Sequence, residues 1–518
     1  MKRRIIGVVI LVIALAAIVI AFRSSALFSS DGFLRTGRNN FIADDDPPET
    51  KPPEITTDES PADEPPADEP PVGESSAGAN TADEDTADEL PPEVPATSSG
   101  PSFTLSRKGK NVVVLFIDRA LGADFPFLVN EKPELVSMYD GFTYYSNVIS
   151  FGGHTNFGAP ALMGGYEYTP VEMNKRSDER LVAKHNESMK VMPVLFSEHG
   201  FDVTVCDAPY GNYYWSSDLS IYKDYPEIKT FRTTGYFKPE NPRAFSGLSS
   251  EVINSYEVLV NLPAMTEISN DDSLNFFFLY NDTPHQIVKF REPEYVPDAY
   301  ANNSEYDAEH KDRFTVDGRT LNVTTDSRMK HYQTNMGTML EIGKWLDYLK
   351  ESEVYDNTKI IIVADHGYYL HQLDELDYPD HKVSRSEYVD VGNFFPLLLV
   401  KDFGAHGFET SDEFMTNADV PTLACEGVIE NPVNPFTGNA ITNDEKTAHD
   451  QYIITNHAGW STASNNGCTF SACTWAAVTS NIWDRDDWKF IDNYMVLTDH
   501  KIPNDIREQI IFRTNVIY

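Results

Sequence analysis

The 518-residue sequence has little cysteine and a marked shortage of basic residues. Its four cysteines are too few for a disulfide-stapled fold. Cys468 and Cys473 are close enough in sequence for one small loop disulfide, whereas Cys206 and Cys425 are expected to be free core thiols. Lys and Arg number 41 against 80 Asp and Glu, a formal net charge of −39. This charge disfavours a nucleic-acid partner, because binding to a phosphate backbone needs basic surface.

The amino terminus is the one region in which basic residues prevail. Residues 1–41 contain six basic residues and one acidic residue, and residues 5–22 are an uninterrupted run of apolar residues and glycine. At 1.5 Å per residue this run spans about 27 Å, enough for the hydrocarbon core of a membrane. We predict a single transmembrane signal anchor, with a cleaved signal peptide as the alternative. In both cases the basic end stays inside and the remainder is extracellular.

Residues 42–102 are acidic and rich in proline. The stretch 42–100 contains 18 Asp and Glu against one Lys, with the short repeats PADEPPADEPP and TADEDTADEL. Such a segment cannot bury enough apolar surface to fold. We predict a disordered, extended tether, with an acidic binding tail as the alternative. Residues 103–518 are then predicted to form an extracellular catalytic domain.

The predicted domain alternates apolar runs of strand length with helix-like stretches. The runs are Asn111–Asp118, Asp202–Cys206, Leu274–Tyr280, Lys359–Ala364 and Phe394–Val400. The helix-like stretches are Lys190–Glu198, Glu251–Leu259 and Ser327–Leu349. This alternation predicts an α/β fold with a mostly parallel central sheet flanked by helices. In such sheets ligands bind beyond the carboxyl ends of the strands.

Polar residues stand at the ends of three of these strands. Asp118 ends the first, Asp282 and His285 follow another, and Asp365 and His366 follow a third. A single Asp after a strand is often a helix N-cap. Three such strand ends at one sheet edge instead indicate a metal site with oxygen and imidazole ligands. For Asp282, a turn stabilised by its side chain is the alternative.

A glycine-rich segment, GGHTNFGAPALMGG at residues 152–165, follows a tyrosine-rich strand. Its glycines allow close approach of the backbone to a ligand, and Thr155 stands at a predicted helix N-terminus, where free amides favour an anion. Thr155 is either a plain N-cap or, beside a metal, a nucleophile, because a hydroxyl attacks poorly until a metal lowers its pKa. His154 is a candidate substrate contact. The aromatic residues at 210–215 either line the mouth of the site or pack in the core.

The motifs LFID, GHTNFGAPALMGG, DNTKIIIVADHG and NADVPTLACEGV occur in the order and spacing of the alkaline phosphatase superfamily. Over roughly residues 111–438 the sequence resembles the sulfatase-type domain shared by lipoteichoic acid synthases and phosphoethanolamine transferases. The resemblance implies an alkaline phosphatase/sulfatase-like fold. It also implies one divalent ion, Mn, Zn, Mg or Ca, held by Asp118, Thr155, Asp365 and His366.

The resemblance further implies that Thr155 is transiently esterified by the phosphoryl group of the substrate. It assigns His285 and His381 to the phosphate oxygens or the leaving group. His457, in the segment TNHAGW, is a candidate ligand of a second ion together with Asp282, or else a structural or solvated histidine.

Three departures from the family pattern limit what the resemblance implies. Asp118 stands where the two transferase branches usually have Glu. Tyr368 and Tyr369, not an acidic run, follow Asp365-His366-Gly367. The phosphoethanolamine transferases also have several membrane helices, whereas this sequence offers one. A formylglycine sulfatase is disfavoured, because Thr155-Asn156-Phe157 lacks the required C/S-x-P-x-R frame.

From these features we expect a membrane-anchored, single-pass enzyme with an extracellular catalytic domain. It is expected to be a metal-dependent phosphotransferase or phosphoesterase that acts on cell-envelope glycans or lipids, with a phospholipid or cell-wall polymer as substrate. The motifs do not separate transfer to an alcohol from hydrolysis by water. The alternatives are a sulfuric ester hydrolase and a catalytically inactive wall-binding module.

Overall fold

The computed structural model describes residues 100–239, 247–248, 250–384, 387–456 and 465–501. The predicted membrane anchor at residues 5–22 lies outside these residues, as does the predicted tether apart from its last three positions. None of the helices in the described ranges combines the length and apolarity that crossing a bilayer requires. The first strand, β1, begins at Phe103.

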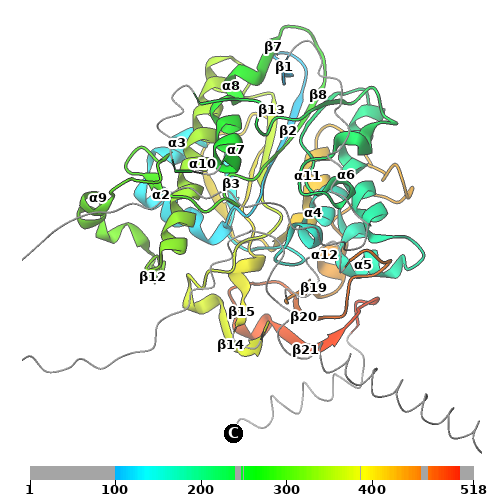
Figure 1. The fold of residues 1–518 in the computed structure, drawn as a ribbon. Helices are drawn as coiled ribbons and strands as arrows, with labels where there is room; N and C mark the ends of the chain where they lie inside the picture. Colours follow the sequence, from blue (N-terminus) through cyan, green and yellow to red (C-terminus); the bar gives the residue numbers. More distant parts are fainter. Residues whose placement is uncertain (1–99, 240–246, 249, 385–386, 457–464, 502–518) are drawn as a thin grey trace, which may run out of the picture. The chain divides into compact units, whose positions relative to one another are not determined.

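An eight-stranded sheet forms the centre of the described part (Figure 1). From edge to edge its strands are β17 (Glu409–Ser411), β3 (Phe142–Tyr145), β16 (Leu398–Lys401), β13 (Thr358–Val363), β2 (Asn111–Ile117), β8 (Asn275–Asn281), β5 (Asp202–Cys206) and β6 (Lys229–Phe231). The strands from β13 to β6 run parallel to one another, as β17 does to β3. Strand β16 runs antiparallel to both of its neighbours. The sheet is therefore mixed but mostly parallel, as predicted, with β16 as the antiparallel strand.

The antiparallel direction of β16 follows from how the chain leaves β13. The described part of this connection contains two 3-10 turns and the hairpin of β14 (Asp377–Lys382) and β15 (Tyr388–Asp390), but no crossover helix. Val363 pairs with Leu398, so the chain leaves and re-enters the sheet at the same edge. A parallel return would have needed a crossover across one face of the sheet.

Helices cover both faces of the central sheet (Figure 1). On one face α4 (Thr155–Gly164) packs against α6 (Leu181–Glu198) and α11 (Val420–Cys425). On the other, the long helix α10 (Asp326–Glu351) packs against α3 (Glu134–Met138), α7 (Ser250–Val260) and α8 (Leu262–Met265). Because both faces are covered, the central strands are apolar throughout: all seven residues of β2 and all six of β13 are buried. Four of the five strand predictions and the helix predictions are confirmed, with α6 beginning nine residues before the predicted stretch. The strand predicted at Phe394–Val400 is shorter, because Phe394 ends a 3-10 turn and β16 begins at Leu398.

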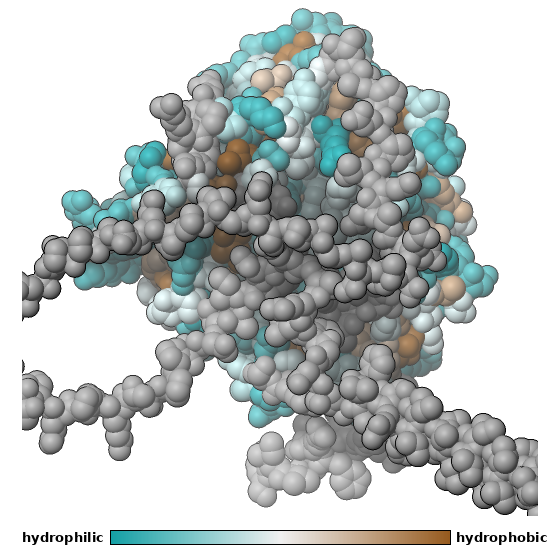
Figure 2. All heavy atoms as spheres, in the orientation of Figure 1, coloured by the Kyte–Doolittle hydropathy of each residue, from teal (hydrophilic) through white to brown (hydrophobic). Residues whose placement is uncertain are grey.

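Smaller elements surround the central sheet. Strands β19 (Gln451–Ile454), β20 (Cys473–Val478) and β21 (Lys489–Met495) form an antiparallel sheet, and the Ile454 amide donates to the Phe151 carbonyl at 3.1 Å, just before the glycine-rich segment. The remaining pairs are β1 (Phe103–Ser106) with β7 (Thr266–Ser269), β4 (Val148–Ile149) with β18 (Met415–Thr416), β9 (Phe290–Arg291) with β10 (Val296–Pro297), and β11 (Thr315–Val316) with β12 (Arg319–Thr320). The remaining helices are α2 (Phe125–Glu131), α5 (Pro170–Lys175), α9 (Ser304–Glu309) and α12 (Glu445–Ala448). In the view of Figure 2, hydrophobic residues are scattered over the described surface among hydrophilic ones.

All four cysteines are free thiols, so the predicted Cys468–Cys473 disulfide is wrong. Cys473 is buried at the start of β20, where its sulfur faces the Met495 carbonyl of β21. The Cys468 carbonyl accepts a hydrogen bond from the buried Lys184 ammonium at 2.7 Å, which ties its loop to α6 instead. Cys206 and Cys425 are buried thiols, as predicted.

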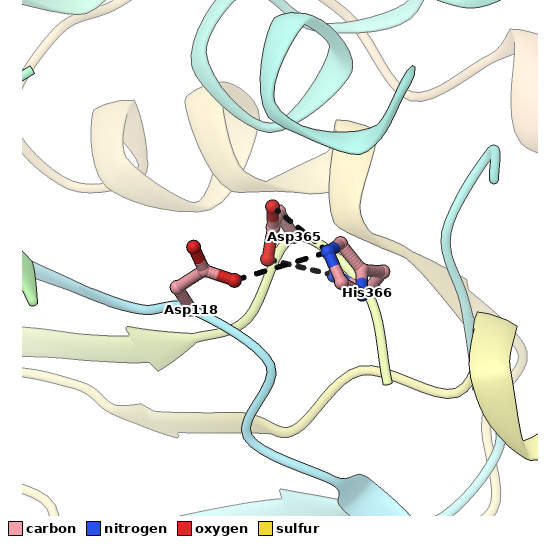
Figure 3. Close-up of side chains that lie close together, drawn as sticks. All are labelled: Asp118, Asp365 and His366. Carbon is pink, nitrogen blue, oxygen red and sulfur yellow. Dashed lines mark hydrogen bonds and ion pairs between the residues drawn. The ribbon is translucent and has the colours of Figure 1, made fainter. Parts of the chain in front are cut away.

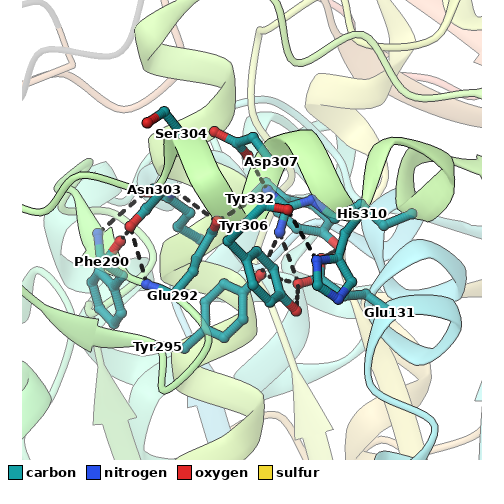
Figure 4. A network of polar contacts seen from close by, with 12 residues as sticks. Glu131, Phe290, Glu292, Tyr295, Asn303, Ser304, Tyr306, Asp307, His310 and Tyr332 are labelled. Carbon is teal, nitrogen blue, oxygen red and sulfur yellow. Dashed lines mark hydrogen bonds and ion pairs between the residues drawn. The ribbon is translucent and has the colours of Figure 1, made fainter.

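A buried ionic network anchors the long connection between β8 and α10 (Figure 4). At its centre the Arg313 side chain, 2% exposed, donates to Glu131 at the end of α2 at 2.9 Å and to Glu292 at 3.1 Å. The Tyr332 hydroxyl of α10 donates to the other oxygen of Glu131 at 2.7 Å. Removing one partner from such a network leaves buried charges without compensation.

We expect Arg313→Ala to lower the free energy of unfolding by about 3–5 kcal/mol, because Glu131 and Glu292 would lose their buried cation. The matched control is Arg291→Ala. Its side chain is 51% exposed and pairs with Glu294 and Asp298, so a loss of about 0–1 kcal/mol is expected. Urea unfolding of the two variants measures the difference. Equal losses would show that the network does not stabilise the fold.

Candidate metal centre

Two neighbouring strands end at the same edge of the sheet and place carboxylates opposite one another. Strands β2 and β13 pair in parallel with Phe116 opposite Val363, so Asp118 and Asp365 follow the strands in matching positions. Figure 3 shows these two side chains converging with His366. The His366 Nε2 atom lies 3.8 Å from Asp118 Oδ1 and 3.6 Å from Asp365 Oδ2. All three side chains are buried.

The hydrogen bonding of His366 determines which ring nitrogen faces the carboxylates. Its Nδ1 lies 2.6 Å from the Gly367 carbonyl oxygen, which can only accept, so Nδ1 carries the proton. Nε2 therefore presents a lone pair to the two aspartates. Burial lowers the pKa of His366 to about 4, although Asp118 opposes this shift, so the ring is neutral at neutral pH. A neutral imidazole with its far nitrogen bound to a backbone carbonyl has the arrangement typical of a metal ligand.

Two carboxylate oxygens at this centre lack partners. Asp118 Oδ2 accepts a hydrogen bond from the Tyr280 hydroxyl at 2.7 Å, and Asp365 Oδ1 accepts one from the His366 amide at 3.0 Å. Asp118 Oδ1 and Asp365 Oδ2 are buried without any hydrogen-bond donor. These are the two oxygens nearest His366 Nε2. Two orphaned oxygens facing a nitrogen lone pair fit a divalent cation, which supplies the missing positive charge.

The pKa values of both carboxyls are raised in this buried site. Burial, followed by the charge of Asp365, raises the pKa of Asp118 to about 7. Burial raises the pKa of Asp365 to about 6, and a hydrogen bond from the Thr155 side chain opposes that shift. A cation must therefore compete with protons for this site near neutral pH.

Thr155 stands at the start of α4, the helix that packs against Asp365. It is the first residue of that helix, is 5% exposed, and its side chain lowers the pKa of the Asp365 carboxyl against the effect of burial. The close approach depends on Gly158, because a Cβ at that position would overlap the Asp365 carbonyl oxygen. Asn417 holds the same contact by donating to the carbonyls of Asp365 at 2.9 Å and Gly158 at 3.2 Å. The structure thus brings together all four residues of the predicted ligand set.

His285 lies near this centre but is not one of its clustered groups. Burial, then the positive charge of Arg119 and of His366, lowers the pKa of His285 well below its usual range. Its amide donates to the Asp282 carbonyl at 3.1 Å, which closes a turn after β8. His154 is the N-cap residue of α4, and its ring centroid lies 6.2 Å from that of His366. Both histidines therefore border the candidate metal centre.

Two other predicted site residues, Asp282 and His381, lie outside the cluster of Asp118, Asp365 and His366. Asp282 accepts hydrogen bonds from Ser255 and Gln286, and the turn predicted as its alternative is stabilised by Asn281, whose Oδ1 accepts the Thr283 amide at 3.0 Å. His381, on β14, bonds to Asp492 at 3.1 Å and stacks on Phe490 of β21. His457 lies outside the described residues.

Several contributors were missed by sequence reasoning. Tyr280 pairs with Phe116 across β8 and β2, which places its hydroxyl at Asp118. The position of Tyr280 at the end of a predicted strand was a usable signal. Arg119, directly after Asp118, was visible in the sequence but had no assigned role. His331, in the middle of α10, lies with Nε2 3.2 Å from the Arg119 carbonyl, and nothing in the helix pattern indicates this contact.

A second group of metal-ligating residue types, His371, Asp377 and Asp390, follows the Asp365-His366-Gly367 segment. Its polar atoms already have partners: His371 Nδ1 lies 2.6 Å from Asp377, and Asp390 accepts the amides of Leu370, His371 and Gly392 at 2.8–3.1 Å. These hydrogen bonds indicate that the group has a structural role and holds the backbone around Leu370, His371 and Gly392.

Comparison with protein-family models matches residues 110–420, more than half of the chain, to the family described as Sulfatase. No match was found among curated proteins.

Solved structures with similar folds include a protein of the alkaline phosphatase superfamily from Vibrio parahaemolyticus, with 14% identity, a TM-score of 0.43, and coverage of 79% of this chain and 87% of that one. The lipoteichoic acid synthase LtaP from Listeria monocytogenes has 11% identity, a TM-score of 0.38, and coverage of 78% and 90%. A phosphonate monoester hydrolase of Agrobacterium radiobacter has 15% identity, a TM-score of 0.41, and coverage of 78% and 94%.

The raised pKa values make the stability of the metal-free protein depend on pH. A carboxyl whose pKa is higher in the folded than in the unfolded state binds protons more tightly when folded, so its contribution to stability is lost as pH rises through the folded value. For Asp118 and Asp365 this loss is expected between about pH 4 and pH 7. We expect urea unfolding of the metal-free chain to show decreasing stability over this range.

Other buried carboxyls also titrate in this range, so the wild-type chain is compared with Asp118→Asn. The stability of this variant should fall less steeply with pH, because the titrating group at position 118 is gone. Saturating Mn²⁺ or Zn²⁺ should reverse the trend for the wild-type chain only, since binding requires both carboxylates to be ionised. Parallel pH profiles for the two metal-free proteins would contradict the raised pKa of Asp118.

Proposed function

The chain belongs to the sulfatase family, and on that basis we propose that it is a metal-dependent enzyme that transfers or hydrolyses a phosphoryl-containing group through Thr155. The observation that carries the proposal is that Thr155 begins α4, the helix that contacts Asp365 through Gly158, beside two buried carboxylate oxygens that lack partners. A hydroxyl in this place stands both at a helix N-terminus and at a candidate metal centre. These are the two conditions under which threonine becomes a nucleophile.

The proposed first step forms a bond between Thr155 Oγ1 and phosphorus while the bond to the leaving oxygen breaks, and the proton that the hydroxyl loses is taken up by the leaving oxygen. Asp365 orients the hydroxyl, and the free amides in the first turn of α4 favour the negative charge that develops there. A divalent ion held by Asp118, Thr155, Asp365 and His366 would lower the pKa of the hydroxyl and offset the charge on the phosphoryl oxygens. The product of this step is a phosphothreonine ester at Thr155.

His285 suits the proton transfers. Its lowered pKa keeps the imidazole neutral at neutral pH, so one ring nitrogen can accept a proton from the group that attacks the phosphothreonine. The sequence-based expectation was instead that an imidazole protonates the leaving oxygen. In the free protein His285 holds no such extra proton, although its N–H can still donate a hydrogen bond. Attack by water makes the enzyme a phosphoesterase, and attack by an alcohol makes it a phosphotransferase.

The identity of residue 155 supports phosphoryl over sulfuryl chemistry. Threonine at this position cannot provide the formylglycine of sulfatases, which requires Cys or Ser. A catalytically inactive module would be expected to have lost a ligand, whereas Asp118, Thr155, Asp365 and His366 are all present and adjacent. We therefore favour an active phosphoryl-transfer enzyme over both alternatives.

The proposed location rests on the amino-terminal sequence. The basic residues before the apolar run at 5–22, and the acidic, proline-rich segment after it, support a single membrane anchor with the catalytic domain outside the cell. A domain tethered in this way would act on phospholipid or cell-wall polymer near the membrane. Delivery of substrate at that surface suits a chain whose own net charge of −39 would repel anions at long range.

We expect Thr155→Val, which keeps the branched shape and removes the hydroxyl, to lower turnover of chromogenic phosphate monoesters and diesters by roughly 10³-fold or more. Thr155→Ser restores a hydroxyl and should keep a measurable part of the activity. Turnover is measured on the full chain loaded with Mn²⁺ or Zn²⁺.

Metal content by mass spectrometry is the companion measurement for both variants. Three ligands remain in Thr155→Val, so bound metal should largely persist, and loss of turnover would then be due to the missing nucleophile. The proposal fails if the valine variant turns over substrate at a near-normal rate. A mass increase on Thr155 after incubation with substrate, absent in the valine variant, would identify the group transferred.

A further inference from the structure

Arg119 is a deeply buried cation without a counterpart. Its side chain follows Asp118 directly, the residue is 7% exposed, and Nε is completely buried with no hydrogen-bond partner. Among the described residues, no carboxylate lies within ion-pair distance of its guanidinium, and no acceptor receives a hydrogen bond from it. Burying an unpaired charge is costly, so a group with this environment indicates a missing anion.

The contrast with Arg313 shows how unusual this environment is. Arg313 is buried to a similar degree and is paired with Glu131, Glu292 and Asp307. The chain has about twice as many acidic as basic residues, 80 against 41, so carboxylates are abundant. At Arg119 the fold nevertheless leaves the guanidinium donors unused.

The backbone at Arg119 has an unusual conformation that its surroundings stabilise. Its φ angle is +65°, in the left-handed region that residues other than glycine rarely adopt. The amide lies 3.4 Å from Asp365 Oδ1, and the carbonyl lies 3.2 Å from His331 Nε2. Such a conformation persists only where the surroundings over-determine it, which is common at functional sites.

Tyr368 provides a platform for the guanidinium, whose central carbon lies 4.3 Å from the ring centroid. Stacking on an aromatic face fixes the plane of an arginine and leaves its edge N–H groups free to bind an oxyanion. Tyr368 follows Gly367 at the position where the sequence departs from the acidic run of the related transferases.

The direction of Arg119 is indicated by the groups that feel its charge. These groups are Asp118 and His366 of the candidate metal centre, and His285 and Tyr210 at its border. The charge of Arg119 therefore acts on the candidate metal centre, where its amide also lies 3.4 Å from Asp365 Oδ1.

We infer that Arg119 binds a tetrahedral oxyanion, the phosphoryl group of the substrate, through the edge of a guanidinium held against Tyr368. This inference rests on the proposed function for the identity of the anion. A guanidinium presents two parallel N–H donors to two oxygens of one phosphate, which lysine cannot do. The same contacts would accept a sulfuryl group, so phosphate and sulfate are compared in the test.

The test measures binding of inorganic phosphate and of sulfate to the full chain in the Thr155→Val background, which removes turnover. Calorimetry is performed with the Mn²⁺-loaded and the metal-free protein. We expect Arg119→Asn to weaken phosphate binding by about 10- to 100-fold in the loaded protein, because the charged donors are lost while asparagine tolerates a positive φ. Arg119→Lys should weaken it less, since it keeps the charge but loses the paired donors.

The matched control is Arg107→Asn. Arg107 lies before β2, at the end of that strand opposite to Arg119, and its exposed guanidinium donates to Ser352 and Asn270. It should leave phosphate binding unchanged. Metal content and thermal unfolding establish that each variant is folded and loaded, and if the asparagine variant does not fold, the lysine variant carries the comparison.

Phosphate binding within twofold of the parent in a folded Arg119 variant would overturn the inference. Stronger Arg119-dependent binding of sulfate than of phosphate would overturn the phosphoryl assignment and leave an oxyanion site of sulfuryl preference. The proposed function fails separately, if the otherwise wild-type chain turns over no phosphate ester while Arg119 still determines phosphate binding.

Discussion

The parallel pairing of β2 with β13 is the interaction on which the candidate site depends. With Phe116 opposite Val363, the two strands carry Asp118 and Asp365 past the same edge of the sheet to matching positions. A shift of one residue in this register would turn one carboxylate to the other face of the sheet. The pairing is stabilised by burial of both strands between helical layers. The packing that forms the core therefore also positions the two carboxylates of the site.

Burial of the charged groups at this edge of the sheet is unfavourable unless positive charge lies beside them. Two carboxylates and the lone pair of a neutral imidazole face one another out of water, and two of the oxygens have no donor. A divalent cation satisfies that arrangement, and Thr155 reaches it because Gly158 permits α4 to approach Asp365. Arg119 adds a second positive centre next to the first. In a strongly acidic chain, attraction of an anionic substrate is thus local rather than long-range.

Much of this could be predicted from the sequence, because strand and helix periodicity is a local property. The runs at 111–118, 202–206, 274–280 and 359–364 became central strands, and the residues after them became the site. The direction of β16 could not be predicted, because it depends on the path of the chain through residues 364–397. The Cys468–Cys473 disulfide failed for a similar reason: proximity in sequence does not determine which way a side chain at the start of β20 points.

The sequence by itself determined the family and the α/β alternation, and it identified the candidate metal ligands and the candidate nucleophile, since these follow from motifs that are continuous along the chain. Only the tertiary structure decided which histidines border the site. His285 and His154 do, whereas His381 packs on β21, and no local pattern distinguishes them. It also shows Arg119 Nε buried without a hydrogen-bond partner among the described residues, which depends on everything that surrounds the side chain. Contacts between residues distant in sequence arise from packing, which local sequence patterns do not predict.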